Sequence, residues 1–141
     1  MIKASKSCKI IVDTNIWISF LIGKSLKGLQ YYINDQSVFI ISCDEQIHEI
    51  TEVFSKPKIK KHFKLDQIDE FFDLFLEVTK LISLKSKINL CRDPKDNYLL
   101  SLAVDANADY LITGDNDLLD LEKMGNTQII RYAEFETIIK E

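Results

Sequence analysis

The chain has 141 residues, 46% of them hydrophobic, and a formal net charge of −4. This favours one folded domain over residues 1–141, and no apolar run reaches the roughly 18–20 residues that span a bilayer, so we expect no membrane association. The net negative charge argues against a general attraction of nucleic acid to the whole surface. Three cysteines without C-x-x-C spacing favour free thiols in a reducing cytoplasm and argue against a zinc site.

Short β-branched runs alternate with helical patterns along the chain. Lys9–Val12 is apolar after its first residue, which is typical of a strand buried on both faces of a parallel sheet. Asp66–Leu81 has the pattern of a strongly amphipathic helix. The other predicted elements, in chain order, are a helical stretch at Ile16–Asn34 interrupted near Gly23, a strand at Ser37–Ile41, a helix ending near Ser55, a short strand at Leu81–Leu84, a helix opened by Asp93-Pro94, a strand at Asp109–Thr113, a turn at Gly114–Asp117, a strand at Gln128–Arg131 and a helix at Ala133–Lys140.

The helix after the second strand has recognisable start and stop signals. Ser42-Cys43-Asp44-Glu45 predicts a capping box with Ser42 at the cap, and Pro57 predicts the end of the helix. Its apolar stripe consists of Ile47, Ile50, Val53 and Phe54.

Acidic residues stand at the ends of two predicted strands. Strands that alternate with helices predict a parallel sheet covered on both faces, and ligands bind such sheets outside the carboxyl ends of the strands. Asp13 follows the first strand, Asp115 and Asp117 follow the Asp109–Thr113 strand, and Asp93 and Asp96 open the helix before it. If the first and fourth strands are neighbours, these acids gather at one edge of the sheet.

Such a gathering of acids points to a divalent cation. Like charges a few ångströms apart repel by about 1–4 kcal/mol a pair in wet surroundings, and a cation relieves that repulsion. Carboxylates without thiolate or imidazole ligands favour Mg²⁺ or Mn²⁺.

Each acid also has an ordinary structural explanation. Asp93 is a good helix cap, and Asp96 would complement the dipole of the same first turn. Asp115 and Asp117 are also common turn or cap residues, and Asn15 can cap the first helix. One further acid, Glu49, shares a helix face with Glu45 and Glu52, and helical geometry does not choose among these three.

The segment after that helix is strongly basic. It carries His62 and no acid, so it is either a solvated loop or a local site for nucleic acid. Its lysines are Lys56, Lys58, Lys60, Lys61 and Lys64.

The motifs "IIVDTNIW", "SCDEQIHEITEVFSKPKI", "DPKDNYLLSLAVDANADYLITGD" and "NDLL", in that order, closely resemble PIN-domain proteins. The resemblance covers nearly the whole chain and is closest to the toxin components of type II toxin–antitoxin systems. It implies a three-layer α/β/α fold with a central, mainly parallel sheet. It also implies a ribonuclease that depends on Mg²⁺ or Mn²⁺, with an RNA substrate, an antitoxin partner and a homodimeric state.

The resemblance also assigns roles to particular residues. The acidic quartet that binds metal and carries catalysis falls on Asp13, Glu49, Asp96 and Asp115, which selects Glu49 and Asp96 among their neighbours. The supporting positions are Asp117 as an accessory metal ligand, Asn15 beside the first aspartate, Thr113 two residues before the fourth acid, and Asp93 as a possible assistant to Asp96.

Other functions stay open at this level. A haloacid-dehalogenase-type phosphatase needs D-x-D after its first strand, and Asn15 stands where the second acid would be. A PIN fold can serve as a silenced RNA-binding module, although none of the four acids is lost. It can also be a general RNA-processing nuclease without an antitoxin, which the sequence does not distinguish from a toxin.

Overall fold

The computed structural model describes residues 7–23 and 27–140. Its strands, in chain order, are β1 (Cys8–Val12), β2 (Val38–Ser42), β3 (Thr79–Leu81), β4 (Tyr110–Ile112), β5 (Lys123–Met124) and β6 (Thr127–Ile130). They form one six-stranded sheet in the order β3-β2-β1-β4-β6-β5. All neighbouring strands are parallel except β5 and β6, which form an antiparallel hairpin.

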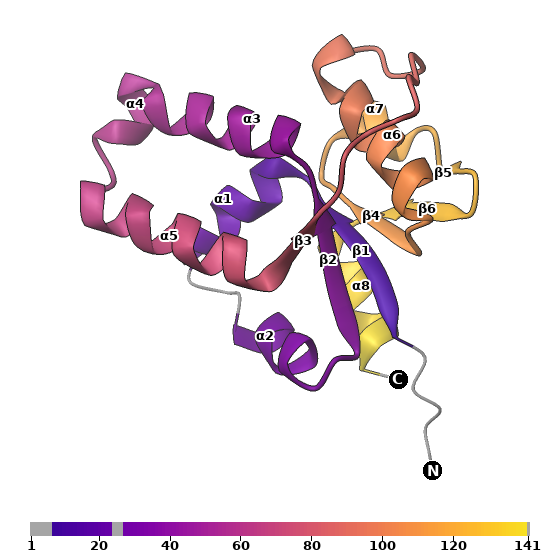
Figure 1. The fold of residues 1–141 in the computed structure, drawn as a ribbon, viewed down its shortest axis with the longest axis horizontal. Coiled ribbons are helices and arrows are strands. Elements are labelled where there is room, and N and C mark those ends of the chain that lie inside the picture. The colour runs from indigo at the N-terminus through magenta and orange to yellow at the C-terminus, as the bar shows by residue number, and fades with distance from the viewer. Residues whose placement is uncertain (1–6, 24–26, 141) are drawn as a thin grey trace.

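Helices cover both faces of this sheet (Figure 1). In chain order they are α1 (Thr14–Gly23), α2 (Lys27–Asn34), α3 (Asp44–Ser55), α4 (Pro57–Lys60), α5 (Leu65–Val78), the 3-10 turn η1 (Pro94–Asp96), α6 (Asn97–Ala106), α7 (Asn116–Leu119) and α8 (Tyr132–Ile139). Successive residues of β1 point to opposite faces, so Ile10 and Val12 pack with α1, α3, α5 and α8 while Ile11 packs with α6 and α7. The predicted three-layer α/β/α fold with a mainly parallel central sheet is confirmed.

The start of α3 differs from the prediction. Ser42 is the last residue of β2 and is fully buried, and its hydroxyl donates to Gln46 Oε1 at 2.5 Å. Cys43 occupies the N-cap position without a side-chain cap hydrogen bond. The predicted capping box is therefore wrong, because the sheet holds Ser42 in extended backbone one residue too early. The helix ends at Ser55, before Pro57, as predicted.

The boundary between α5 and β3 also differs. The amphipathic pattern predicted a helix to Leu81 and a strand from Leu81, but the helix ends at Val78. Thr79 leaves helical geometry, with φ −109° and ψ 153°, because β3 pairs with β2 from this residue onward. The β5–β6 hairpin was not predicted, since a two-residue strand carries no readable pattern. Gly125 has φ 59° in its turn, a backbone angle that favours glycine.

The order of the strands fixes where a ligand can bind. Strand β1 lies between β2 and β4: the chain runs from β1 outward through β2 to β3 and then crosses to β4 on the other side of β1. The crevice at such a reversal, outside the carboxyl ends of the strands, is the usual ligand site of an open α/β sheet. Val12 pairs with Ile112 at these carboxyl ends, so the residues that follow the two strands are close neighbours. Within the described ranges, none of the helices combines the length and apolar character that crossing a bilayer requires.

Candidate active site

Asp13 lies at the carboxyl end of β1 and is only 5% exposed. Its Oδ2 accepts a 2.6 Å hydrogen bond from the Thr113 hydroxyl, and its Oδ1 accepts the Asn15 amide at 3.3 Å. Burial raises the pKa of the Asp13 carboxyl, these two hydrogen bonds oppose the rise, and the negative charges of Glu49 and Asp115 add to it. Asp13 is therefore a buried carboxyl group whose oxygens accept hydrogen bonds from protein donors.

The cap of the first helix is also different from the prediction. Helix α1 begins at Thr14, and the Asp13 carbonyl accepts the amides of Ile16 and Trp17. Asp13 therefore caps α1, and Asn15 lies inside the helix with an exposed side chain. Asn15 supports Asp13 through its backbone amide.

Asp115 follows β4 and is joined to Asp13 through Thr113. The Asp115 amide donates to Thr113 Oγ1 at 3.0 Å, so this hydroxyl contacts the segments that carry both acids. Asp115 Oδ1 accepts the Asp117 amide at 2.9 Å and caps the start of α7. The structural and the functional explanation of Asp115 are therefore compatible.

Asp96 ends η1 immediately before α6. Burial, hydrogen bonding with Asp115 and the charge of Asp13 raise the pKa of the Asp96 carboxyl to about 7. Asp93 is exposed and accepts the Lys95 amide at 3.1 Å, so it acts as the cap of η1. Its charge also raises the pKa of Asp96, although less than the other causes do.

Glu49 reaches the same edge of the sheet from α3. Its Oε1 accepts the Thr14 hydroxyl at 2.6 Å and the Tyr98 hydroxyl at 2.5 Å. Glu45 and Glu52 are exposed, so only Glu49 of the three faces the other acids. Burial and the neighbouring Glu49 charge raise the pKa of Tyr98, which keeps its hydroxyl protonated as a donor.

A fully buried glutamine ties α3 to the end of β1. Gln46 Nε2 donates to the Val12 carbonyl at 2.6 Å, and its Oε1 accepts the Ser42 hydroxyl. The sequence analysis missed Gln46, Thr14 and Tyr98. Gln46 carried a readable signal, because it lies four residues before Ile50 on the apolar stripe of the helix.

Asp117 is partly engaged by a cation at the rim of the site. Arg92 Nε lies 3.4 Å from Asp117 Oδ1, and Arg92 Nη2 lies 3.1 Å from Asp120 Oδ2. Arg92 is 73% exposed, so water screens both ion pairs and their contribution to stability is small. Asp117 is half-buried and adjoins the other acids without being enclosed by them.

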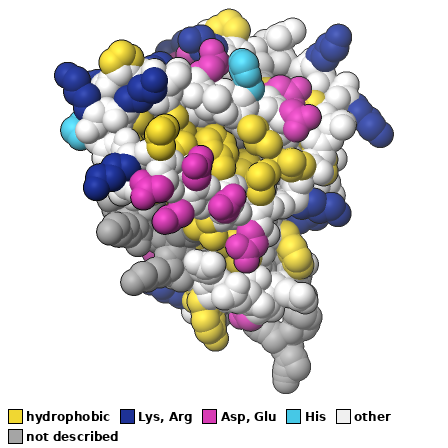
Figure 2. All heavy atoms as spheres, turned by 60° about the vertical axis from the view of Figure 1, so that its left-hand side comes forward, with side chains coloured by type: hydrophobic (Ala, Val, Ile, Leu, Met, Phe, Trp, Pro, Cys, Tyr) yellow, Lys and Arg dark blue, Asp and Glu magenta, His cyan; other side chains and the backbone are white. Residues whose placement is uncertain are grey.

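The basic segment lies beyond the far end of α3. Its lysines (Lys56, Lys58, Lys60, Lys61 and Lys64) are all exposed, and within the described residues none of them forms an ion pair. Lys56 is seven residues after Glu49, which corresponds to about 10 Å along a helix. Figure 2 shows lysine and arginine side chains around the margins of this face of the molecule and acidic side chains across its middle.

The donor set fits a hard divalent cation. Asp13, Asp96 and Asp115 offer carboxylate oxygens at one edge, and such ligands suit Mg²⁺ and Mn²⁺. In residues 7–23 and 27–140, no three histidine, cysteine or acidic side chains are already arranged around a common point as ligands. A shift of these side chains would be needed to bring three of them onto one ion.

Comparison with known proteins identifies the family. The family model described as "PIN domain" matches residues 9–117, which include every acid of the candidate site. The chain belongs to the PIN-domain family. This confirms the resemblance that the motifs carried.

Three relatives illustrate the PIN-domain match. The uncharacterized protein MJ1680 of Methanocaldococcus jannaschii is 30% identical over 116 residues, which cover 80% of this chain and 74% of that protein. The structure of VapBC2 from Rickettsia felis, bound to a DNA fragment from their promoter, superposes with a TM-score of 0.58 at 15% identity and covers 86% of this chain and 96% of that chain. PAE2754 from Pyrobaculum aerophilum has a TM-score of 0.62 at 13% identity and covers 98% of this chain and 100% of that chain. These two likenesses establish the fold.

Proposed function

We propose that this PIN-domain protein is a metal-dependent endoribonuclease that hydrolyses RNA phosphodiester bonds. The observation that carries the proposal is the buried Asp13, held by Thr113 at the carboxyl edge of the sheet with Asp96 and Asp115 beside it. Carboxylates held together in a partly buried place repel one another, and a bound cation would offset that repulsion.

Asp13, Asp96 and Asp115 are the residues that would hold Mg²⁺ or Mn²⁺, with Asp117 as an accessory ligand at the rim. Such an ion supplies a Lewis acid that lowers the pKa of water and neutralises charge on the phosphate. Thr113 holds the Asp13 carboxylate in one orientation. Glu49 would hold the attacking water or contribute to a second ion. The Asn15 amide supports Asp13. Asp93 would assist Asp96 by capping η1, the turn that ends at Asp96.

The RNA backbone would lie across the site and along the lysine-bearing margin of α4. Lys56, Lys58 and Lys60 are exposed there, with Lys61 and Lys64 just beyond. Lysines that neutralise phosphates raise affinity in a salt-dependent manner without reading sequence. This local positive charge would offset the acidic character of the chain as a whole.

We further propose that the protein is the toxin of a toxin–antitoxin pair, is a homodimer, and works in the cytoplasm with a cognate antitoxin protein. The fold it shares with a chain of the VapBC2 complex supports the toxin role. Its cysteines, Cys8, Cys43 and Cys91, are all free, as expected in a reducing compartment. A small neighbouring gene that encodes a DNA-binding protein would support the pairing, whereas its absence would favour a general RNA-processing nuclease.

The activity is tested by incubating purified protein with mixed cellular RNA and Mn²⁺. We expect cleavage by the wild-type protein and a loss of at least about 100-fold in Asp13→Asn, because one carboxylate charge and its metal contact disappear. Asp69→Asn is the matched control, since Asp69 is exposed on α5, away from the site. This variant should cleave RNA like the wild type. Equal cleavage by the wild-type protein and Asp13→Asn would indicate a contaminating nuclease and refute the proposal.

A further inference from the structure

Two hydroxyl groups converge on a single oxygen of Glu49. Thr14 Oγ1 lies 2.6 Å and Tyr98 OH 2.5 Å from Glu49 Oε1, and the two hydroxyls lie 3.2 Å from each other. All three side chains are at least half-buried, so the hydrogen bonds are sheltered from water. Donation by two hydroxyls to a charged oxygen is a strong restraint on a side chain that otherwise has three freely rotating bonds.

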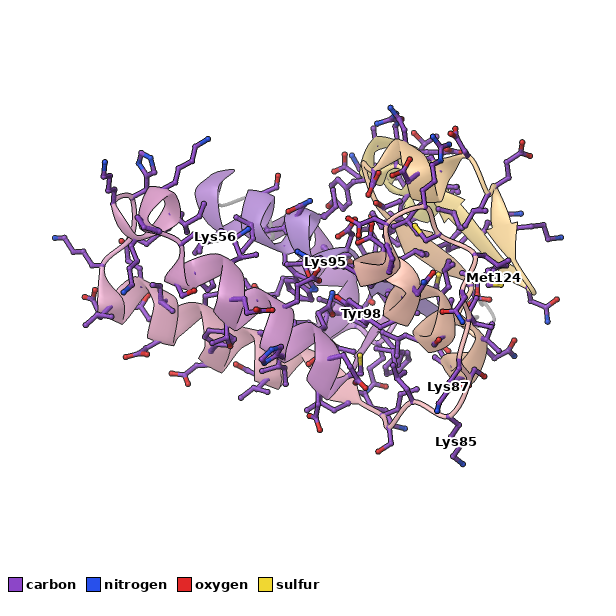
Figure 3. The ribbon with its side chains drawn as sticks, turned by 90° about the horizontal axis from the view of Figure 1, so that it is seen from above. Lys56, Lys85, Lys87, Lys95, Tyr98 and Met124 are labelled. Carbon is purple, nitrogen blue, oxygen red and sulfur yellow. The ribbon has the colours of Figure 1, made fainter. Side chains whose placement is uncertain are left out.

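The three residues come from elements on different sides of the sheet. Glu49 lies on α3, which packs on one face, and Tyr98 lies on α6, which packs on the other. The Tyr98 ring packs in the α6 core, and its hydroxyl reaches across the carboxyl edge of the sheet to Glu49. Figure 3 shows Tyr98 between α6 and α3, near Lys95 of η1 and apart from Lys85 and Lys87.

The arrangement leaves the second carboxylate oxygen available. Within the described part of the chain, Glu49 Oε2 forms no hydrogen bond, whereas Oε1 has two. Glu49 is also close enough to Asp13 for its charge to act on that carboxyl group. A rigid side chain with one occupied oxygen and one free oxygen is suited to present the free oxygen to a ligand.

We propose that Tyr98 is a positioning residue for Glu49: together with Thr14 it fixes the Glu49 side chain so that Oε2 faces the ion or the attacking water. This inference rests on the proposed nuclease function. It gives the junction of η1 and α6 two tasks two residues apart, since Asp96 at the end of η1 supplies a carboxylate and Tyr98 in α6 orients the carboxylate from the opposite layer. Partners that orient a ligand in this way influence metal binding even though they do not touch the ion.

The experiment is a calorimetric titration of Mn²⁺ into wild-type protein and Tyr98→Phe in the absence of RNA. Phenylalanine keeps the ring in its core and removes only the hydroxyl. We expect Mn²⁺ to bind Tyr98→Phe about 10–100-fold more weakly, as is typical when an orienting partner is lost. The Mn²⁺ concentration for half-maximal RNA cleavage should rise in parallel, while KM for RNA at saturating Mn²⁺ stays unchanged.

Matched variants separate positioning from general packing. Tyr110→Phe removes a half-buried hydroxyl from the start of β4, away from the acids, and should bind Mn²⁺ like the wild type. Thr14→Val removes the second donor and should weaken binding in the same direction, which keeps the test valid if Tyr98→Phe folds poorly. In a Glu49→Gln background, Tyr98→Phe should cause little further loss, because its effect passes through the Glu49 carboxylate.

The outcomes distinguish the two proposals. Unchanged Mn²⁺ affinity in Tyr98→Phe, or an equal loss in the Glu49→Gln background, would overturn the positioning role while leaving the nuclease intact. A wild-type protein that binds Mn²⁺ but cuts no RNA would refute the proposed nuclease function. The comparison of Mn²⁺ affinities would still test the positioning role of Tyr98. A wild-type protein that binds no Mn²⁺ would contradict both.

Discussion

The Thr113 hydroxyl shows how one side chain can organise a site. It is fully buried, donates to Asp13 Oδ2 and accepts the Asp115 amide, so it fixes the two acids relative to each other. A hydroxyl can both donate and accept, so this one group, directly after β4, serves both acids.

Replacing Thr113 with valine keeps the shape of the side chain and removes both hydrogen bonds. We expect about 1–3 kcal/mol lower stability, because the buried Asp13 carboxylate loses a donor. Metal affinity should fall about 10–100-fold, because Asp13 is no longer oriented. Denaturant unfolding and Mn²⁺ titration measure the two effects.

Thr127→Val is the control for that substitution. Thr127, the first residue of β6, is also a buried threonine, and its hydroxyl donates to the Ala108 carbonyl at 2.7 Å. It contacts none of the acids, so its loss should lower stability and leave Mn²⁺ affinity unchanged. If Thr113→Val also retained wild-type affinity, Thr113 would have only a structural role.

Some of these residue contacts were predictable and others were not. Asp13 and Asp115 follow apolar strands, so the sheet rule placed each at the carboxyl edge. That the two acids meet depends on β1 and β4 being neighbours, which the strand order shows and the sequence did not. The choice of Glu49, by contrast, came from the family resemblance, and its contacts with Thr14 and Tyr98 depend on how two helix layers meet. No local sequence pattern encodes such a contact between layers.

At the scale of elements, the segment between β3 and η1 is fastened to α6 by one carboxylate. Asp105 accepts the backbone amides of Lys85 at 2.6 Å and Ser86 at 2.9 Å, and it also accepts the Ser86 hydroxyl. These bonds hold the pKa of the Asp105 carboxyl below its usual range. A segment without secondary structure is thereby held against the helix whose start carries Asp96.

Asp105→Asn should loosen this attachment in a pH-dependent way. A carboxyl with a depressed native pKa contributes stability above its unfolded pKa of about 3.9 and loses that contribution as pH falls through the lower native value. We expect the variant to be about 1 kcal/mol less stable at pH 7, since the site is largely exposed. The difference from wild type should shrink below pH 4.

Urea unfolding at pH 7, 5, 4 and 3 checks this expectation. Trp17 is the single tryptophan of the chain and is 1% exposed in the core, so its fluorescence reports unfolding. Asp69→Asn provides a comparison with an exposed carboxylate. A stability gap for Asp105→Asn that stayed constant over this pH range would show that the charge of Asp105 is not what matters.

The observed bounds of helices and strands match the predicted ones where the packing agrees with the local sequence pattern. Strands β1 and β4 were predicted within a residue or two, because β-branched runs buried on both faces have few other conformations. The error at Val78–Leu81 arose because the apolar pattern of α5 runs on into β3, and pairing with β2 decides where the helix stops. Ser42 was misassigned as a helix cap because its pairing with Leu81 of β3 keeps it in the sheet.

At the scale of the whole molecule, stability should depend on divalent cations. Asp13, Asp96 and Asp115 repel one another at the sheet edge, and an ion that binds only the folded protein stabilises it by mass action. We expect a higher Tm in millimolar Mg²⁺ or Mn²⁺, worth about 2.7 kcal/mol when the free ion reaches 100 times Kd. Excess chelator should reverse the shift.

Asp13→Asn should show a much smaller increase in Tm than the wild type, because one ligand and one negative charge are gone. Thermal unfolding with and without the ion measures both proteins. An unchanged Tm of the wild type in millimolar Mn²⁺ would contradict a metal site at this edge.

The pairing of β1 with β4 has a consequence for how the molecule is made. Asp13 and the Thr113 hydroxyl that holds it are 100 residues apart in the chain. A growing polypeptide emerges from its N-terminus, so β1 and β2 can meet early while β4 is still unmade. Until Thr113 and Asp115 have been added, the nascent chain contains Asp13 without the residues that complete the site. The site therefore stays incomplete until most of the chain has been translated.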